Sequence, residues 1–366
     1  MEPIRIGIIG VGIIGKSHLR EYEKIHGVEI VAACDIDASE LERVADLHKI
    51  PHRYAAFRDL LARDDIQAVD VCLHNNLHAP VTIAALHAGK HVFCEKPMAG
   101  AYKDALAMRQ TAKETGKWLQ IQLSTLFSKE TRIAKRLIDA GRLGHIYHAR
   151  SCGFRRRGRP FVDGYATPDF VKKPISGGGA LFDMGVYHIA QMLYLLGMPE
   201  VERVSGKVYQ ETDMDAGRRE SSGYSVEELG TGYVRCAGNL TIDIVEAWAI
   251  HLNNLEGSSI LGAKGGLRLE PLSFHSTEED LETNMTFESG SIDWRWHQLN
   301  PEMSAYDSPA QHWVAALQGK VPLLPTADIA LRTMLISEGI YLSDKLGREV
   351  TREEIEERAV STALVL

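Results

Sequence analysis

Three glycines near the amino terminus have the spacing of a phosphate-binding turn. Gly10, Gly12 and Gly15 follow the apolar run 4–9, and a helical stretch starts at Gly15. The first glycine permits a tight turn, the second lets a ligand approach the backbone, and the third lets helix and strand pack closely. The free N–H groups of the helix then face the ligand. We expect the pyrophosphate of a dinucleotide to lie against Gly10, Gly12, Ile13, Ile14 and Gly15.

An acidic residue follows at the distance that such a turn requires. Asp35 directly follows the second apolar run, 29–34, and lies 20 residues after Gly15. A carboxylate there accepts hydrogen bonds from the adenosine ribose hydroxyls and repels a 2′-phosphate. The next residues, Ile36 and Asp37, include no arginine. The pattern predicts NAD rather than NADP, and a turn or helix-cap role for Asp35 is the alternative.

Polar side chains also follow the third and fourth apolar runs, 68–73 and 91–94. Because the strand ends of a doubly wound sheet face the cofactor crevice, these side chains are further cofactor candidates. A turn and a helix cap explain two of them, Asn75 and His78, equally well, and a Glu-Lys pair after a strand is often a solvated turn. The candidates are Leu73, His74, Asn75, His78, Glu95 and Lys96.

The elements that position these residues form two different patterns. Up to about residue 120, short apolar runs alternate with helical stretches, which predicts a parallel sheet with helices on both faces. Later runs are longer and partly alternating, which predicts a mostly antiparallel sheet. We therefore predict an α/β fold with a Rossmann domain over 1–124 and an α+β domain with an open sheet over 125–366. The later strands are expected at 201–211, 230–237, 240–252 and 259–269, with loops at 151–179 and 212–227.

The composition narrows the class of protein. A length of 366 residues suits about two domains, and 45% hydrophobic with 25% charged residues is typical of a globular chain. A net charge of −8 gives no general attraction for nucleic acid or an anionic membrane. The five cysteines form no Cys-x-x-Cys pair, and no secretory signal or long apolar run is present. We expect a cytoplasmic protein with reduced thiols. His145 and His148 lack a partner carboxylate, so no metal site is expected.

Several motifs resemble those of the Gfo/Idh/MocA family, the relatives of glucose–fructose oxidoreductase and inositol dehydrogenase. They are the run 88–97 (AGKHVFCEKP), Asn75-x-x-His78, the segment 177–185 (GGGALFDMG) and the segment 262–267 (GAKGGL). The resemblance implies a Rossmann domain joined to an open sheet, with the active site between them. It also implies redox chemistry at one carbinol of a sugar, cyclitol or glycoside. Lys96 would be the active-site lysine beside the nicotinamide, preceding a cis bond to Pro97.

A helix predicted over 181–196 carries the remaining catalytic candidates. Asp183 and Tyr187 lie about 40° apart around it, whereas His188 lies about 140° from Asp183. Relatives usually have a histidine acid/base at the position of Tyr187, and some have tyrosine. We predict that Tyr187 exchanges the proton, that Asp183 orients the substrate, and that Lys96 loses proton affinity beside a cationic nicotinamide. His188 is the alternative base, or a histidine facing another surface.

The one basic cluster is the run 155–160, RRRGRP. It lacks interleaved aromatic residues, which argues against nucleic-acid binding. The resemblance places this loop at the interdomain crevice, so Arg157 is a candidate to hold a substrate oxygen or the cofactor; a solvated loop is the alternative. The chain departs from many relatives at Ser124-Thr125-Leu126, where they carry an Asn and an Arg. The loss of that Arg weakens any inference of a substrate from those relatives.

The leading hypothesis is NAD-linked oxidation of a secondary hydroxyl on a sugar, cyclitol or glycoside. A second is a redox-neutral enzyme that keeps its NAD and oxidises transiently, as a glycosidase or a self-recycling oxidoreductase does. A third is a non-catalytic NAD-binding sensor, against which the joint presence of Lys96, Asp183 and Tyr187 argues. We also expect a homodimer or homotetramer, because relatives bury the open sheet against a second subunit and the apolar residues at 242–252 suit that contact.

Overall fold

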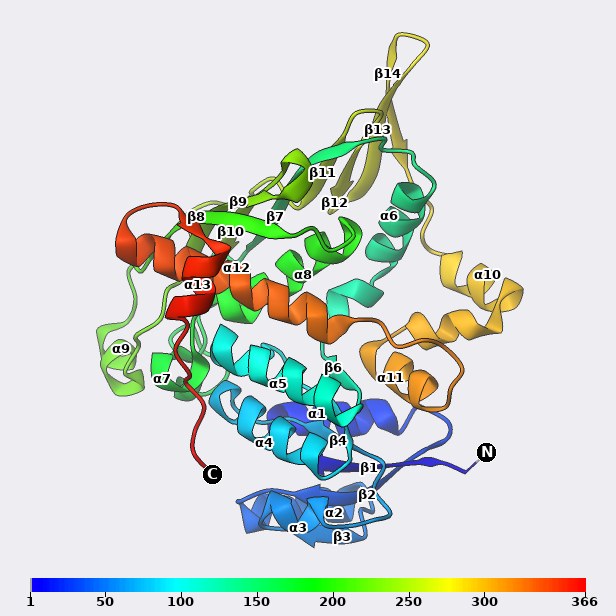
Figure 1. Cartoon of the computed structure of the whole chain (residues 1–366), viewed down its shortest axis with the longest axis vertical. Coiled ribbons are helices and arrows are strands. Elements are labelled where there is room, and N and C mark those ends of the chain that lie inside the picture. The colour runs from blue at the N-terminus through cyan, green and yellow to red at the C-terminus, as the bar shows by residue number, and fades with distance from the viewer. Residues whose placement is uncertain (1) are drawn as a thin grey trace.

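Two sheets organise the computed structural model, which describes residues 2–366 (Figure 1). The lower sheet in the figure has six parallel strands in the order β3-β2-β1-β4-β5-β6. The strand order reverses between β1 and β4, and ligands bind at such switch points in open α/β sheets. The strands are β1 (Ile4–Ile9), β2 (Val28–Cys34), β3 (His52–Tyr54), β4 (Ala68–Val71), β5 (His91–Cys94) and β6 (Leu119–Ile121).

Helices cover both faces of this sheet, as the strand–helix pattern predicts. Most are supplied by the same segment, but α11 (Pro309–Leu317) returns from the carboxyl-terminal part and lies beside the first helix (Figure 1). Its Trp313 is fully buried in one cluster with Ile6, Tyr22 and Phe93. The proposed boundary at residue 125 stays a prediction, and the later segment completes the first core. The local helices are α1 (Ile13–Tyr22), α2 (Ala38–Leu47), α3 (Phe57–Leu61), α4 (Asn75–His87) and α5 (Tyr102–Thr115).

The upper sheet has nine strands in the order β14-β13-β12-β11-β7-β10-β9-β8-β15. Only β7 and β10 pair in parallel; the other neighbours are antiparallel, which confirms the predicted mostly antiparallel sheet. The strands are β7 (Ile146–Phe154), β8 (Val201–Tyr209), β9 (Leu229–Cys236), β10 (Leu240–Ala247), β11 (Ser259–Gly262), β12 (Gly266–Leu269), β13 (Leu272–Glu278), β14 (Leu281–Thr286) and β15 (Val350–Thr351).

One long helix, α12 (Thr326–Leu346), runs between the two sheets in Figure 1. It packs on β8, on α5 and on α8 (Val186–Leu195), so it ties the two parts of the chain together. The remaining helical elements are α6 (Lys129–Asp139), α7 (Lys173–Ser176), α9 (Ala216–Ser222), α10 (Ile292–Leu299), α13 (Arg352–Arg358) and the single turns η1 (Ser124–Phe127), η2 (Pro168–Val171), η3 (Leu181–Gly185), η4 (Ala237–Asn239) and η5 (Pro301–Tyr306).

Local predictions differ from the structure at several places. The helix expected over 181–196 begins with the π-helical turn η3 before α8, and the run 259–269 forms a tight pair of strands, β11 and β12. The segment 151–179 begins inside β7, and 212–227 contains α9. The last residues of that second segment turn inward, because the side chain of Glu227 bonds to buried backbone groups.

The apolar residues at 242–252, expected to face a second subunit, differ in their exposure: Leu252 is 51% exposed, whereas the isoleucines of β10 are buried. Ile242 and Ile244 of β10 are 0% and 1% exposed. The side chains between them belong to a polar network, in which His148 contacts Thr241 and Asp243. The alternation of β10 therefore directs its isoleucines inward, so these two side chains are not available to a second subunit. The oligomeric state stays a prediction.

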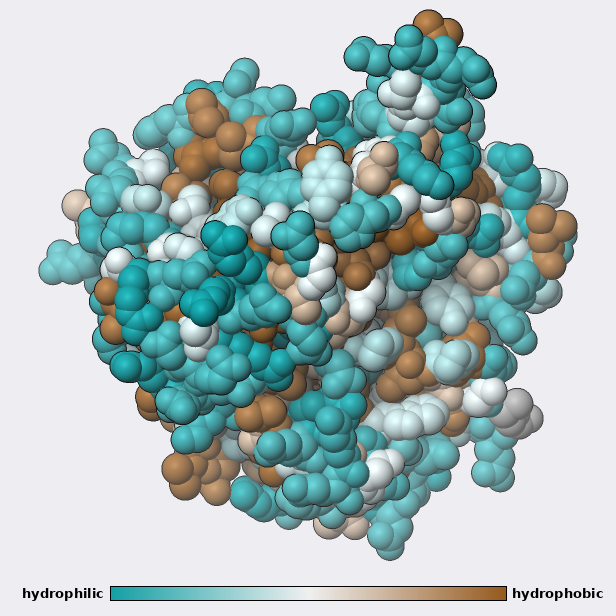
Figure 2. All heavy atoms as spheres, turned by 45° about the horizontal axis from the view of Figure 1, so that its top comes forward, coloured by the Kyte–Doolittle hydropathy of each residue, from teal (hydrophilic) through white to brown (hydrophobic). Residues whose placement is uncertain are grey.

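The surface is polar over much of the face in Figure 2, with separate hydrophobic groups rather than a continuous cover. One such group marks the tip of the hairpin of β13 and β14, which projects at the top of Figure 1. Among residues 2–366, no helix combines the length and apolar character needed to cross a membrane.

Candidate active site

The glycine turn has the backbone geometry that its sequence predicts. Gly10 has φ +94°, and a Cβ there would lie 2.3 Å from the carbonyl oxygen of Cys72. A Cβ on Gly15 would lie 2.1 Å from the carbonyl oxygen of Gly10. By contrast, a Cβ on Gly12 would meet no atom within 4 Å, so the space above the turn is open. Only glycine fits the first and third positions, and a ligand has access at the second.

The start of α1 is suited to an anion. Its first turn has no acidic residue and no side-chain cap, so the amino-terminal N–H groups stay available. Ile13 is 70% and Ile14 is 39% exposed. These exposed apolar side chains beside the open space at Gly12 suit a ligand with a flat apolar surface. The residues therefore fit a dinucleotide at this turn.

Asp35 joins the second strand to the glycine turn. Its Oδ2 accepts a hydrogen bond from the N–H of Val11 at 2.8 Å, and its Oδ1 accepts one from the N–H of Asp37 at 3.0 Å. Each carboxylate oxygen keeps a lone pair for another donor. Asp35 is thus held at the end of β2 beside the turn, where the sequence pattern places a ribose-binding carboxylate.

The third strand end contributes interdomain contacts. The Asn75 amide donates to the carbonyl oxygen of Ser176 at 2.8 Å, and the exposed imidazole of His74 lies 3.9 Å from Asp169. Leu73 is half-buried and packs against the main core. A cofactor role for Leu73, His74 and Asn75 stays a prediction.

His78 lies beneath the lysine turn rather than at its surface. The side chain is fully buried, with Nδ1 2.8 Å from the carbonyl oxygen of Pro97 and Nε2 3.0 Å from that of Leu73. Burial lowers the pKa of His78. A neutral imidazole carries one N–H, so His78 donates to one of these two carbonyl oxygens. The buried ring supports the Lys96–Pro97 turn, and a cofactor role for His78 stays a prediction.

Glu95 belongs to a buried charged network. Its Oε1 lies 2.9 Å from Nε2 of His18, and Nδ1 of His18 lies 2.8 Å from Asp70. Burial opposes a charge on His18, but Asp70 and Cys72 raise its pKa well above the usual value. The same imidazolium, assisted by Lys96, holds the pKa of the buried Glu95 below its usual range. The thiol of Cys72 also lies within hydrogen-bonding distance of His18 and of Asp70, at 3.4 Å from each.

The network reaches the active lysine through the backbone, because Oε2 of Glu95 accepts the N–H of Lys96 at 2.9 Å. The Lys96–Pro97 bond is cis, as expected. Sequence reasoning placed Glu95 near the cofactor but missed His18, the third residue after Gly15. A histidine on the buried face of the glycine helix, opposite a strand with a central aspartate, is the signal that would have found it.

Lys96 and Asp183 meet across the two parts of the chain. The ammonium Nζ lies 2.8 Å from Oδ1 of Asp183, and the indole N–H of Trp248 donates to Oδ2 at 2.9 Å. Burial favours neutral Asp183, yet Lys96 and Trp248 hold the pKa of that carboxyl below its usual range. Burial likewise disfavours the Lys96 ammonium, but Asp183, Tyr187 and Glu95 raise its pKa above the usual value. The protein groups by themselves thus raise the proton affinity of Lys96. The predicted loss beside a cationic nicotinamide stays a prediction.

The side chains of Tyr187 and His188, at the start of α8, contact different neighbours. The Lys96 ammonium lies 5.0 Å from the centroid of the Tyr187 ring, and burial raises the pKa of Tyr187. His188 instead bonds through Nδ1 to Glu246 at 2.9 Å. Glu246 is fully buried, and it raises the pKa of His188 although burial opposes this. Tyr187 is thus the member of the pair that lies with Lys96 and Asp183.

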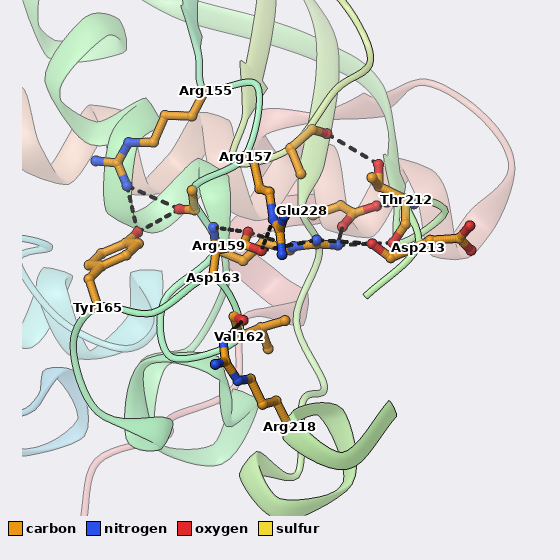
Figure 3. A network of polar contacts seen from close by, with 12 residues as sticks. Arg155, Arg157, Arg159, Val162, Asp163, Tyr165, Thr212, Asp213, Arg218 and Glu228 are labelled. Atoms are coloured by element: carbon orange, nitrogen blue, oxygen red, sulfur yellow. Dashed lines mark hydrogen bonds and ion pairs between the residues drawn. The ribbon is translucent and has the colours of Figure 1, made fainter. Parts of the chain in front are cut away.

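The arginine loop brings a different arginine to this cluster than the sequence suggested. Arg157 is 74% exposed and pairs with Asp163 at 3.0 Å, away from Asp183. Arg155 lies 3.9 Å from Oδ2 of Asp183. It also donates to the hydroxyl of Tyr165 at 2.5 Å (Figure 3). Arg155 therefore replaces Arg157 as the arginine beside the predicted catalytic residues.

Trp248, Arg155 and Tyr165 complete the cluster, and sequence reasoning missed all three as site residues. Trp248 directly follows β10 and is fully buried. A tryptophan at a strand end is a weak signal, because it is more often a core residue than a hydrogen-bond donor. Arg155 was visible only as one of four arginines in the run 155–159. Its neighbours on the chain gave no reason to prefer it.

Comparison with known proteins agrees with this arrangement. Residues 4–123 match the model of an oxidoreductase family with an NAD-binding Rossmann fold, and residues 131–268 match the GFO/IDH/MocA C-terminal domain. A D-glucoside 3-dehydrogenase of Escherichia coli is 28% identical over 95% of this chain and 97% of its own. An inositol 2-dehydrogenase of Salmonella paratyphi B is 36% identical over 38% of this chain and 43% of its own.

Among solved structures, an oxidoreductase from Agrobacterium radiobacter in complex with NAD⁺, L-tartaric acid and magnesium has the same fold. It superposes with a TM-score of 0.77 at 20% identity, covering 96% of this chain and 99% of its own. The two matched domain models lie in the order that the two sheets show, and the predicted family, fold and NAD cofactor are confirmed. The chain belongs to the Gfo/Idh/MocA family of NAD-binding oxidoreductases.

Proposed function

We propose that the protein is an NAD-dependent dehydrogenase that oxidises one secondary hydroxyl of a sugar, cyclitol or glycoside. The observation that carries the proposal is the pair of Lys96 and Asp183 at 2.8 Å, with Tyr187 beside the ammonium. A donor, a carboxylate acceptor and a phenol next to one another can hold a carbinol and exchange its proton. The dehydrogenase relatives named above supply the substrate class.

The cofactor would lie along the carboxyl ends of the parallel strands. Gly10, Gly12 and Gly15 would hold its pyrophosphate, Asp35 its adenosine ribose, and Lys96 would lie at the nicotinamide end. When bound, NAD supplies the acceptor for the hydride that leaves the carbinol carbon. The protein groups then have to bind the sugar, orient one hydroxyl and take up its proton.

The protonation states decide how that proton moves. Asp183 stays anionic, whereas Lys96 and Tyr187 both hold their protons near neutral pH because their pKa values are raised. Lys96 and Tyr187 together must therefore release one proton to solvent before either can accept the proton of the substrate hydroxyl. Lys96 would release that proton more readily with a cationic nicotinamide bound beside it, since like charges disfavour the ammonium. In the reverse direction the protonated pair is ready to donate.

Arg155 and Tyr165 would contact the substrate on the side opposite Lys96. Arg155 binds Tyr165 and the carbonyl oxygen of Gly158 through Nη1, so its remaining N–H donors are available for substrate oxygens. This assigns to Arg155 the role that the sequence suggested for Arg157.

The decisive experiment incubates the purified protein with NAD and a panel of neutral sugars, cyclitols and glycosides while NADH absorbance and products are recorded. Stoichiometric NADH and ketone support the proposed dehydrogenase. Product without net NADH contradicts it and supports the redox-neutral enzyme. Bound NAD with no turnover on any member of the panel would contradict the proposed dehydrogenase and favour the hypothesis of a non-catalytic sensor.

A further inference from the structure

Asp183 and two of the groups beside it, Trp248 and Arg155, lie on segments that are bonded to one dipeptide, Glu227–Glu228. Asp183 itself lies on the turn η3, Trp248 donates to its carboxylate, and Arg155 lies on the arginine loop. Neither glutamate touches Asp183, and both are buried, at 7% and 1% exposed. Buried carboxylates are costly unless their oxygens are fully bonded, so their partners show what they hold in place.

Glu227 holds the turn that carries Asp183. Its Oε2 accepts the N–H of Gly179 at 2.8 Å and its Oε1 accepts the N–H of Leu181 at 3.0 Å. The hydroxyl of Tyr341 on α12 also donates to Oε1 at 2.8 Å. A Cβ on Gly179 would lie 1.9 Å from the carbonyl oxygen of Glu227, so the two segments are in close backbone contact. Two N–H groups at the start of η3 therefore depend on one carboxylate.

Glu228 holds the arginine loop. Its Oε2 accepts from Nη1 of Arg159 at 3.0 Å, and its Oε1 accepts the backbone N–H groups of Glu211 and Thr212 (Figure 3). Its carbonyl oxygen accepts the N–H of Trp248 at 2.7 Å. The same residue thus fixes the loop through its side chain and the indole donor of Asp183 through its backbone.

Arg159 connects Glu228 to the rest of the arginine loop. It is 2% exposed and also bonds through Nε to Asp163 at 2.9 Å. Between it and Arg155 lies Gly158, whose carbonyl oxygen accepts from Arg155 at 3.2 Å and from the hydroxyl of Tyr165 at 2.6 Å. Figure 3 shows this sequence of contacts from Glu228 to Tyr165. Arg155 directly follows β7, and its N–H bonds to the carbonyl oxygen of Ala247 at 2.8 Å, so its backbone is held by the sheet. The buried ion pair holds the other side of the loop, where Gly158 and Tyr165 contact the Arg155 guanidinium.

We propose that Glu227 and Glu228 are paired positioning residues for the substrate half of the site. Glu227 sets the position of Asp183, and Glu228 sets the positions of Arg155 and Tyr165. The two side chains bond to different segments, Glu227 to the start of η3 and Glu228 to Arg159 of the arginine loop, so one dipeptide holds both. The kinetic consequences rest on the proposed dehydrogenase function; the structural consequences do not.

The test compares Glu227→Gln and Glu228→Gln with Glu220→Gln on the exposed face of α9 as the matched control. Each glutamine keeps the shape but replaces one acceptor oxygen by a donor. Amide hydrogen exchange by mass spectrometry is followed in peptides covering 155–165 and 177–187. In parallel, KM and kcat are measured for the sugar found active in the panel, and KM for NAD.

We expect Glu228→Gln to raise exchange in 155–165 and to raise KM for the sugar by about threefold or more, the size of one lost hydrogen bond. Glu227→Gln should raise exchange in 177–187 and lower kcat more than it changes KM. KM for NAD should stay unchanged in both. The proposal is overturned when both variants behave like Glu220→Gln, or when both disturb the two segments alike.

Two further variants keep the test informative when a glutamine variant does not fold. Tyr341→Phe removes one donor from Glu227 but leaves its carboxylate, and Arg159→Lys keeps the charge beside Glu228 but loses the forked geometry. Each should reproduce the segment-specific exchange of its partner. A wild type that oxidises no sugar refutes the proposed function, while the exchange pattern still decides the positioning roles.

Discussion

The nucleotide half and the substrate half of the site are built in different ways. Around the glycine turn, the binding groups are mostly backbone N–H groups and one carboxylate, Asp35, all within the first 35 residues. Around Asp183, the groups are side chains from Lys96, Arg155 and Trp248, which come from distant segments. The buried Glu227 and Glu228 bond to the segments that carry Asp183, Arg155 and Trp248.

This difference teaches where the two halves can change. A backbone site tolerates little variation, because a Cβ at Gly10 or Gly15 would collide with a carbonyl oxygen. A side-chain site can be altered one residue at a time while the buried supports stay in place. The nucleotide half therefore suits one cofactor, and the substrate half suits diversification among relatives that act on different carbinols.

The largest expected effect tests the point where the two halves meet. Lys96→Met keeps the aliphatic stem but removes the ammonium that contacts Asp183 at 2.8 Å. We expect turnover to fall by about a thousandfold, since charge stabilisation and proton exchange are both lost. NAD affinity, measured by titration calorimetry, should change little. The exposed Lys103→Met is the control, and comparable losses in both variants would contradict the role of Lys96.

The next effect separates two neighbours on α8. Tyr187→Phe should lower turnover by about a hundredfold, the usual contribution of a positioned acid/base group. His188→Gln should lower it much less, because His188 is engaged with Glu246 rather than with Lys96. Steady-state kinetics of the two variants checks this. If only the histidine variant loses activity, the assignment of Tyr187 is wrong.

The pH dependence gives an independent reading of the same pair. The pKa values of Lys96 and Tyr187 are both raised, so the proton-accepting form grows as pH rises above neutrality. Oxidation should accelerate with rising pH, and the reverse reduction should slow. Tyr187→Phe should flatten this limb. A profile that levels off just above the usual histidine pKa, and that His188→Gln abolishes, would instead point to His188 as the base.

Sequence reasoning anticipated the backbone geometry of the glycine turn and the place of Asp35 beside it, while the cofactor contacts of these residues stay predictions. The glycine spacing, Asp35 and the strand end at Lys96 follow from local pattern, since each lies at a fixed offset from a strand. The meeting of Lys96 with Asp183 also followed, but only because the motifs resembled a known family. The sequence pattern selected His78 and Glu95 but did not indicate that both side chains are buried. A strand-end position does not show whether a side chain points into the crevice or beneath it.

The substrate half was less accessible for a physical reason. Arg155 and Arg157 are both exposed members of one run, and only the contact of Asp163 with Arg157 and of Tyr165 with Arg155 distinguishes them. The segment 212–227 is polar enough to suggest a surface loop, yet Glu227 turns inward to bond N–H groups 46 and 48 residues away. Such pairings depend on tertiary structure, which periodicity does not encode.

A smaller effect tests whether the nucleotide half is as selective as its carboxylate implies. Asp35→Ser should reduce the preference for NAD over NADP by roughly 30-fold, because ribose hydrogen bonds and repulsion of a 2′-phosphate are lost together. Measurement of kcat/KM with each cofactor checks this. Asp37→Ser, which changes a neighbouring helix-capping carboxylate, is the control. An unchanged ratio in Asp35→Ser would show that Asp35 serves only to hold Val11.

The smallest effect compares two arginines of the same loop. Arg155→Gln should raise KM for the sugar by about fivefold, the value of one hydrogen bond, and leave KM for NAD unchanged. Arg157→Gln should have no effect on either constant, because its guanidinium is 74% exposed and pairs with Asp163. The two substitutions are chemically identical and only two residues apart. A difference between them must therefore come from orientation toward Asp183. Equal effects would mean that the loop acts through its overall charge, and the substrate half would then resemble the nucleotide half in depending less on individual side chains.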